Sequence, residues 1–186
     1  MIREQQKKIE IGIVRKQDLS EKQAKIVYLG IGSNLGNKKK NIENAKYKLH
    51  AHNIEILKCS SNYESNSWPD PRKPKFINII IKIKTILSSL ELLNICNLIE
   101  IELGRIRYKK NSPRTCDIDI IDYDQKVFMK KGINLILPHK SMTQRNFVLL
   151  PLFEINQSWK HPKSKINIAK LISSLKIKDL RSIKQI

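Results

Sequence analysis

The chain has 186 residues, of which 40% are hydrophobic and 28% charged, and its formal net charge is +19. That length suits one domain, and the composition excludes a disordered chain, a collagen-like repeat and a small disulfide scaffold. Its apolar stretches are much shorter than the ~20 residues of a bilayer span, so no transmembrane helix is expected.

Residues 1–24 are predicted to form a basic N-terminal extension. They lack the apolar segment of a secretory signal and are too acidic for a transit peptide, so we expect a cytoplasmic protein. Cys59, Cys96 and Cys116 show neither disulfide nor metal-ligand spacing and are expected to be reduced thiols. Residues 25–186 are predicted to form a single domain.

The pattern of apolar residues predicts the order of strands and helices along that domain. Strands are predicted at 26–32, 54–59, 63–65, 76–85, 114–121 and 126–129. Helices are predicted at 38–52, 89–103, 147–153 and 166–175, with Ser88 as a cap and Gly104 as a stop signal. This order predicts an α+β fold, a ferredoxin-like α/β sandwich with a mainly antiparallel sheet and helices on one sheet face.

The glycine-rich segment 30–36 follows the first strand. Its spacing, G-x-G-x-x-x-G, is one residue longer than a dinucleotide fingerprint, and Asn37 stands where a phosphate-binding loop would need Lys. We interpret it as a tight strand-to-helix turn.

Asp117 and Asp119 form a pair of acids in a predicted strand. Residues two apart in a strand point to the same face, so both carboxylates project together and repel unless a cation lies between them. Hard oxygen ligands with open positions favour Mg²⁺. The alternative is an exposed strand carrying two solvated acids.

Arginines surround the acidic pair in the sequence and are conspicuous because most of the basic residues are Lys. Arg105, Arg107 and Arg114 lie just before it, and Arg145 follows His139 downstream. Guanidinium groups beside metal-binding carboxylates are typical of a polyphosphate site, with His139 as a further candidate phosphate ligand. The alternative for the upstream arginines is surface pairing with Glu100 and Glu102.

The strong positive charge favours a polyanionic partner, although a general bias toward Lys would explain much of it. A binding module must therefore be considered beside an enzyme: a basic ferredoxin-like domain that binds nucleic acid without catalysis. The aromatic strand motif of such RNA-binding domains is absent.

Several motifs resemble those of the 6-hydroxymethyl-7,8-dihydropterin pyrophosphokinases of folate biosynthesis. The resemblance spans about residues 25–175 and rests on Tyr28–Asn37, Asn41, Ala45, Tyr63–Ser65, Phe76–Asn78, Ile99–Glu100, Gly104–Arg107, Pro113–Asp119, Leu137–His139 and Arg145–Val148. Two departures stand out. Asn111-Ser112 occupies the place of a Trp-Gly pair in some members, and the segment 67–71 lacks the glycine often found there.

The resemblance implies transfer of the ATP pyrophosphoryl group to the pterin hydroxymethyl oxygen, with release of AMP. It implies that Asp117 and Asp119 bind two Mg²⁺ ions and that Phe76, Asn78 and Phe147 bind the pterin. It also implies an ATP site, formed by Glu100, Arg105, Arg114, His139 and Arg145, in which Arg105 and Arg114 are catalytic. We expect a monomer that takes ATP and the pterin as substrates, with no membrane association and no specific nucleic acid.

Overall fold

The computed structural model describes residues 23–106, 112–129 and 135–186. Nearly all of the predicted N-terminal extension, together with Arg107 and Asn111, lies outside these residues. Within them, no helix is long and apolar enough to cross a bilayer.

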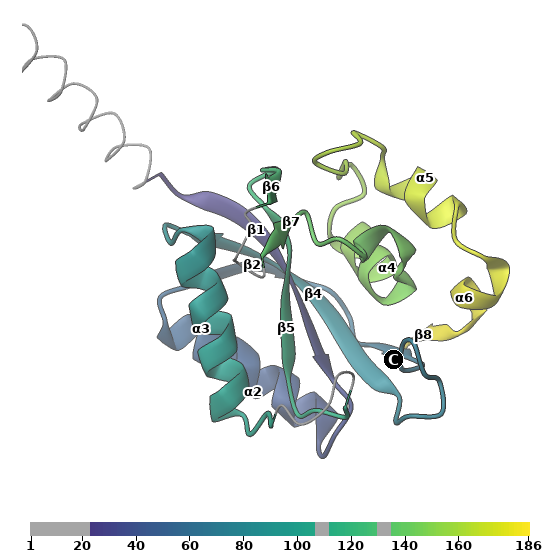
Figure 1. The fold of residues 1–186 in the computed structure, drawn as a ribbon, viewed down its shortest axis with the longest axis horizontal. Coiled ribbons are helices and arrows are strands. Elements are labelled where there is room, and N and C mark those ends of the chain that lie inside the picture. The colour runs from purple at the N-terminus through teal and green to yellow at the C-terminus, as the bar shows by residue number, and fades with distance from the viewer. Residues whose placement is uncertain (1–22, 107–111, 130–134) are drawn as a thin grey trace, which may run out of the picture.

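An antiparallel sheet forms the centre of the molecule (Figure 1). Its strands follow the order β5-β1-β4-β3-β8, and β2 also pairs with β4. The strands are β1 (Lys25–Ser33), β2 (Glu55–Cys59), β3 (Tyr63–Ser65), β4 (Phe76–Thr85), β5 (Asp117–Tyr123) and β8 (Ile183–Gln185). The placement of β1 between β4 and β5 is the arrangement of a ferredoxin-like fold, so the predicted fold class is confirmed.

Two helices, α2 (Lys38–Ala51) and α3 (Ser89–Glu102), cover one face of the sheet (Figure 1). Ser88 caps α3 in a capping box with Glu91, and Gly104 follows the helix with a positive φ of 77°, as predicted. The buried helix residues Ile42, Ala45, Leu49, Leu92, Cys96 and Ile99 pack against isoleucines of β4. Leu90 and Ile101, two further apolar residues of α3, are exposed.

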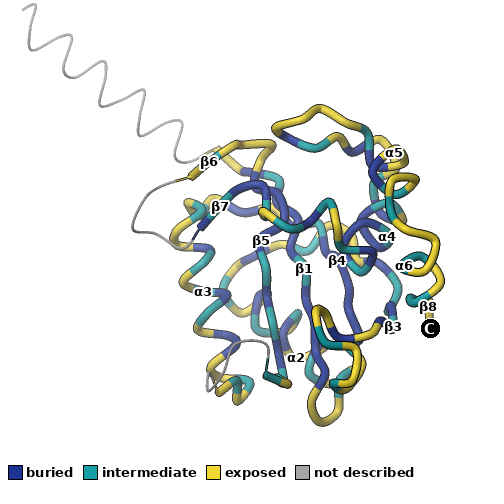
Figure 2. Tube along the Cα trace, turned by 45° about the vertical axis from the view of Figure 1, so that its right-hand side comes forward, coloured by how far each residue is buried: buried dark blue, intermediate teal, exposed yellow. Residues whose placement is uncertain are grey.

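The expectation of helices on one sheet face is wrong, because α4 (Asn146–Ile155) and α5 (Ile168–Ser173) pack on the opposite face. Tyr28, Ile80 and Ile121 project from the sheet on that side and would be exposed without this cover. Figure 2 shows the buried strands between the two layers. Each sheet face therefore has its own apolar core.

The remaining elements are short and contribute to both apolar cores. They are β6 (Phe128–Met129), β7 (Ile136–Leu137), the 3₁₀ turn η1 (Met142–Gln144) and α6 (Ile177–Arg181). Phe128 and Leu137 pack on the side of α2 and α3, whereas Met142 packs on the side of α4. The predicted helix 166–175 is shorter, and the chain then turns into α6 and β8, which pairs with β3. Strand β8 was not predicted, since three residues carry too little periodicity to show a strand.

Candidate active site

Two glycines of the central strand create the floor of a cavity on the second sheet face. The antiparallel register places Gly32 between Asn78 on β4 and Asp117 on β5. Gly30 lies between Ile80 and Asp119 in the next row. Because neither glycine has a side chain, the groups beside them border an open space, a cavity of about 370 Å³. Both predicted acids line it, on the same face of β5.

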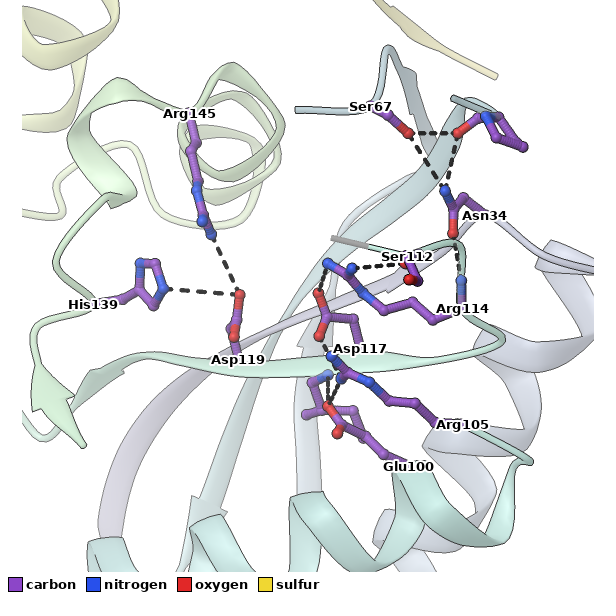
Figure 3. A network of polar contacts seen from close by, with 12 residues as sticks. Asn34, Ser67, Glu100, Arg105, Ser112, Arg114, Asp117, Asp119, His139 and Arg145 are labelled. Atoms are coloured by element: carbon purple, nitrogen blue, oxygen red, sulfur yellow. Dashed lines mark hydrogen bonds and ion pairs between the residues drawn. The ribbon is translucent and has the colours of Figure 1, made fainter. Parts of the chain in front are cut away.

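Asp117 is held from two sides by arginines (Figure 3). Its Oδ1 accepts a hydrogen bond from Arg105 at 2.5 Å and its Oδ2 one from Arg114 at 2.5 Å. Burial disfavours ionisation of this carboxyl, but the two guanidinium groups outweigh it and hold the pKa of Asp117 below its usual value. Asp117 is therefore ionised in the absence of any ligand.

Asp119 is held much more loosely. Its Oδ2 lies 3.4 Å from Arg145 Nη1 and 3.9 Å from His139 Nε2, and its side chain is 40% exposed (Figure 3). Burial, with added repulsion from Asp117, raises the pKa of Asp119 to about 6. The cavity thus holds one carboxylate with an incompletely compensated charge.

His139 reaches the site from the loop after β7. Burial, together with the positive charges of Arg145 and Lys140, lowers the pKa of His139 to about 4. At neutral pH the imidazole is therefore uncharged, and its contact with Asp119 is not an ion pair. A neutral ring at this place can still exchange hydrogen bonds with a ligand.

Aromatic rings lie beside the two arginines that border the cavity. The guanidinium carbon of Arg114 is 5.1 Å from the centre of the Phe76 ring. That of Arg145 is 5.6 Å from the Phe147 ring and 5.4 Å from the Trp68 ring. These distances fit cation–π contacts, so apolar ring surface and positive charge alternate along the cavity wall.

Asn78 presents a polar edge to the same space. Its Nδ2 donates to the Ser65 hydroxyl at 2.9 Å, which leaves its carbonyl oxygen next to Gly32. A flat ring in the cavity could donate a hydrogen bond to that oxygen. The predicted pterin residues Phe76, Asn78 and Phe147 all line the cavity.

Arg114, His139 and Arg145 also line the cavity, whereas Glu100 and Arg105 lie behind Asp117. Glu100 is 3% exposed, and its Oε1 accepts a hydrogen bond from Ile118 N and lies 2.5 Å from Arg105. Arg105 thus holds Asp117 from the side away from the cavity, and Glu100 holds Arg105. Their predicted direct contacts with ATP stay predictions.

Sequence reasoning did not single out Asn34, which lies at the end of β1. Its carboxamide accepts from Arg114 N at 2.8 Å and donates to Pro74 O at 3.1 Å. It thereby joins the segment that carries Arg114 to the loop before β4 (Figure 3). Its position in a glycine-rich turn was the available signal, but the partners are distant in sequence.

The donor set fits a magnesium ion. Two carboxylates two residues apart share one face of β5, and both line the cavity. The described residues contain no group of three or more acid, His or Cys ligands. An ion here would therefore need water or phosphate oxygens to complete its shell, as Mg²⁺ commonly does.

Paired carboxylates, guanidinium groups and aromatic rings in one cavity are typical of enzymes that transfer a phosphoryl group to a flat heteroaromatic substrate. Comparison with known proteins narrows this class. The family described as 7,8-dihydro-6-hydroxymethylpterin-pyrophosphokinase (HPPK) matches residues 28–157. The chain belongs to this family. The family expected from the sequence motifs is confirmed.

Individual relatives agree with the match. The 2-amino-4-hydroxy-6-hydroxymethyldihydropteridine pyrophosphokinase of Bacillus subtilis is 38% identical over 71% of this chain and 78% of its own length. The protein of that name from Aquifex aeolicus is 39% identical over 73% of this chain and 83% of its own. The folic acid synthesis protein fol1 of Pneumocystis carinii is 36% identical over 84% of this chain, which spans only 21% of that relative.

Solved structures show the same fold. A crystal structure of Plasmodium falciparum HPPK-DHPS, a triple mutant with pteroate, has a TM-score of 0.69 at 15% identity. It covers 88% of this chain, which corresponds to 47% of that chain. At this identity the likeness supports the fold.

Proposed function

We propose that this chain transfers the pyrophosphoryl group of ATP to the hydroxymethyl oxygen of 6-hydroxymethyl-7,8-dihydropterin in an Mg²⁺-dependent reaction that releases AMP. One observation carries the proposal: the acids and arginines suited to a triphosphate lie in the same cavity as two phenylalanines and an asparagine suited to a pterin. A cavity of about 370 Å³ that combines aromatic rings with polar and charged groups suits a small flat ligand that reacts with a phosphate chain.

The pterin is proposed to bind in the slot formed by Phe76 and Phe147, with its polar edge against Asn78. Aromatic faces stabilise a flat heteroaromatic ring, and the Asn78 carbonyl oxygen selects a ring that offers an N–H donor. The bond from Asn78 to Ser65 fixes the direction of that oxygen before the ligand arrives. Substrate orientation would thus be set by β3 and β4.

The triphosphate is proposed to bind along Arg114, Arg145 and His139. Asp117 and Asp119 would hold Mg²⁺, which when bound would supply the positive charge that neutralises phosphate oxygens. The pterin hydroxyl oxygen attacks the β-phosphorus and loses its proton to solvent. The bond from the β-phosphorus to the oxygen that bridges to the α-phosphorus breaks, and AMP leaves with that oxygen. The guanidinium groups compensate the charge that shifts onto the departing AMP.

Rate acceleration would come mainly from alignment, because the protein has little covalent chemistry to perform in this reaction. The Asp117 carboxylate is fixed by Arg105 and Arg114, and Arg105 lies 2.5 Å from the buried Glu100. This chain of ion pairs holds one metal ligand rigidly. The monomeric state and the cytoplasmic location expected from the sequence stay predictions.

The test is AMP formation in a mixture of ATP, Mg²⁺ and the reduced pterin alcohol, with omission of each component in turn. We expect AMP only when all three are present. Phosphate binding without AMP, combined with RNA binding, would instead favour the nucleic-acid module.

The Phe147→Ala variant should lose pterin affinity and keep its ATP affinity. Equal loss of both, with a lowered melting temperature, would show that this ring serves the core.

A further inference from the structure

Trp68 is an exposed aromatic residue at the rim of the cavity. It lies in the loop between β3 and β4 and is 53% exposed, whereas the other tryptophan of the chain, Trp159, is 3% exposed. An indole that is half in water contributes little to either apolar core, although such a large ring is usually buried. Packing in the apolar cores therefore does not explain the position of Trp68.

The nearest explanation is its contact with Arg145. The guanidinium carbon lies 5.4 Å from the Trp68 ring centre and 5.6 Å from that of Phe147. Its contact with Asp119 is long, at 3.4 Å, and the buried Nε has no hydrogen-bond partner among the described residues. Two ring faces, more than hydrogen bonds, thus set the orientation of this guanidinium group.

Trp68 also marks a boundary. It lines the cavity with the acidic pair and, on its other side, an adjoining groove of about 1020 Å³ that includes His139, Lys140 and Gln144. A ligand long enough to extend from the cavity into this groove would pass beside the indole. Trp68 is thus exposed where a triphosphate chain would cover it.

The loop that carries Trp68 is tied to the opposite side of the site. Ser67 Oγ donates to Pro74 O at 2.6 Å and accepts a weaker hydrogen bond from Asn34 at 3.4 Å. Asn34 in turn holds the backbone N–H of Arg114. The two cavity arginines are therefore connected through one short loop, Arg114 by hydrogen bonds and Arg145 by ring stacking.

We propose that Trp68 is a positioning residue for Arg145, which it holds in the orientation that binds the triphosphate. The inference rests on the proposed function of this site, because it assigns the ligand of Arg145. Trp68 acts through the guanidinium group, and the bound phosphate chain buries the indole further. The aromatic face is the property that matters, so phenylalanine can replace it in part.

Steady-state kinetics test this assignment with Trp68→Ala and Trp68→Phe. Loss of the ring should raise the KM for ATP and lower kcat, together by about three- to tenfold in kcat/KM, the range expected of a cation–π contact. Trp68→Phe should recover most of this loss, and the pterin Kd should change less than about twofold. Tyr47→Ala, which removes another exposed ring on α2, should change none of these values.

Tryptophan emission gives a second readout that does not require turnover. Inorganic triphosphate with Mg²⁺ should shift the emission of the wild type, since Trp68 is exposed and lies against Arg145. The same addition should leave Trp68→Phe unchanged, because the remaining Trp159 is buried on the α4 side of the molecule. This readout does not depend on AMP formation. If the wild type formed no AMP, that result would overturn the proposed function but not the role of Trp68.

Two results would overturn the role of Trp68. The first is a Trp68→Ala variant whose kcat and KM for ATP equal those of the wild type, or whose pterin affinity falls while its ATP affinity is retained. The other is wild-type emission that does not respond to triphosphate while Arg145→Ala lowers triphosphate affinity.

Discussion

The two ends of the cavity floor differ in how firmly they are held. At the Asp117 end, two arginines reach the carboxylate at 2.5 Å, and Arg105 lies 2.5 Å from the buried Glu100. At the Asp119 end, the nearest cation, Arg145, lies at 3.4 Å, the uncharged His139 lies at 3.9 Å, and the carboxylate is partly exposed. The Asp117 end is therefore ordered before any ligand binds, whereas the charge of Asp119 is fully balanced only by a ligand.

This difference follows from the register of the sheet. Asp117 lies at the start of β5, where the segment carrying Arg114 and the end of α3 meet, whereas Asp119 faces the cavity from the middle of the strand. Under the proposed function, the preorganised end would define where metal and phosphate bind, and the less compensated end would favour a bound cation. The first prediction concerns activity, where the two ends should behave alike.

Removal of either carboxylate should have the largest effect. Asp117→Ala and Asp119→Ala should each reduce kcat by about 10²-fold or more, which corresponds to about 3 kcal/mol of transition-state stabilisation. The measurement is AMP formation as a function of Mg²⁺ concentration. Near-normal turnover in both variants would remove the metal assignment.

The second prediction separates the two ends. The sequence pattern predicts that loss of either acid relieves repulsion, but the structure gives Asp117 two arginine partners that its removal would leave uncompensated. In the metal-free protein, Asp117→Ala should lower the free energy of unfolding by about 2 kcal/mol. Asp119→Ala should leave it unchanged or slightly higher. Chemical denaturation in EDTA measures both, and equal losses would contradict the comparison.

The third prediction concerns the anchor of the rigid end. Asn34→Ala removes the buried acceptor of Arg114 N and should cost about 1–2 kcal/mol of stability while lowering turnover, because Arg114 loses its fixed position. Asn37→Ala is the matched control. It removes the cap of α2, so stability should fall by about 1 kcal/mol with turnover retained. Equal loss of turnover in the two variants would argue against this role of Asn34.

The smallest effect is a difference in pH dependence of the metal-free protein. The pKa of Asp119 is raised to about 6, so its contribution to stability is present below its unfolded value of 3.8 and is lost as the pH rises through about 6. As the pH rises from 3.8 through about 6, the free energy of unfolding of the wild type should therefore fall relative to that of Asp119→Asn. The pKa of Asp117 is lowered, so its contribution is lost only as the pH falls below 3.8.

Urea denaturation of the wild type, Asp119→Asn and Asp117→Asn in EDTA tests this prediction. Asp117 itself does not titrate between about pH 5 and 8. The loss of unfolding free energy in Asp117→Asn, relative to the wild type, should therefore change over this range only through the titration of Asp119. A wild type and Asp119→Asn with parallel pH profiles would show that Asp119 is as well compensated as Asp117.

The sequence was sufficient to predict the features that depend on local pattern. The alternating isoleucines of β4, the capping box at Ser88 and the shared face of Asp117 and Asp119 all follow from periodicity or from a short motif. These features require no knowledge of how distant segments meet. The fold class therefore followed from the order of the elements.

Some features that depend on tertiary contacts were not predicted. Helix α4 packs on the second sheet face because Tyr28, Ile80 and Ile121 are apolar there, yet continuous apolar strands do not show which face a helix covers. The location of Glu100 behind Asp117 depends on a hydrogen bond to Ile118 across 18 positions. The contact of Trp68 with Arg145 likewise joins two loops that are remote in sequence.

The absence of a side chain at Gly32 has a consequence for inhibitor resistance. A Cβ atom there would lie 2.9 Å from Asn78 Oδ1 and 3.4 Å from the Phe76 ring, so any larger residue would intrude on the proposed pterin slot. An inhibitor that fills the space above Gly32 would occupy a volume that the natural substrate also requires. Substitution at this position would exclude the inhibitor and the substrate together, which makes it a poor route to escape.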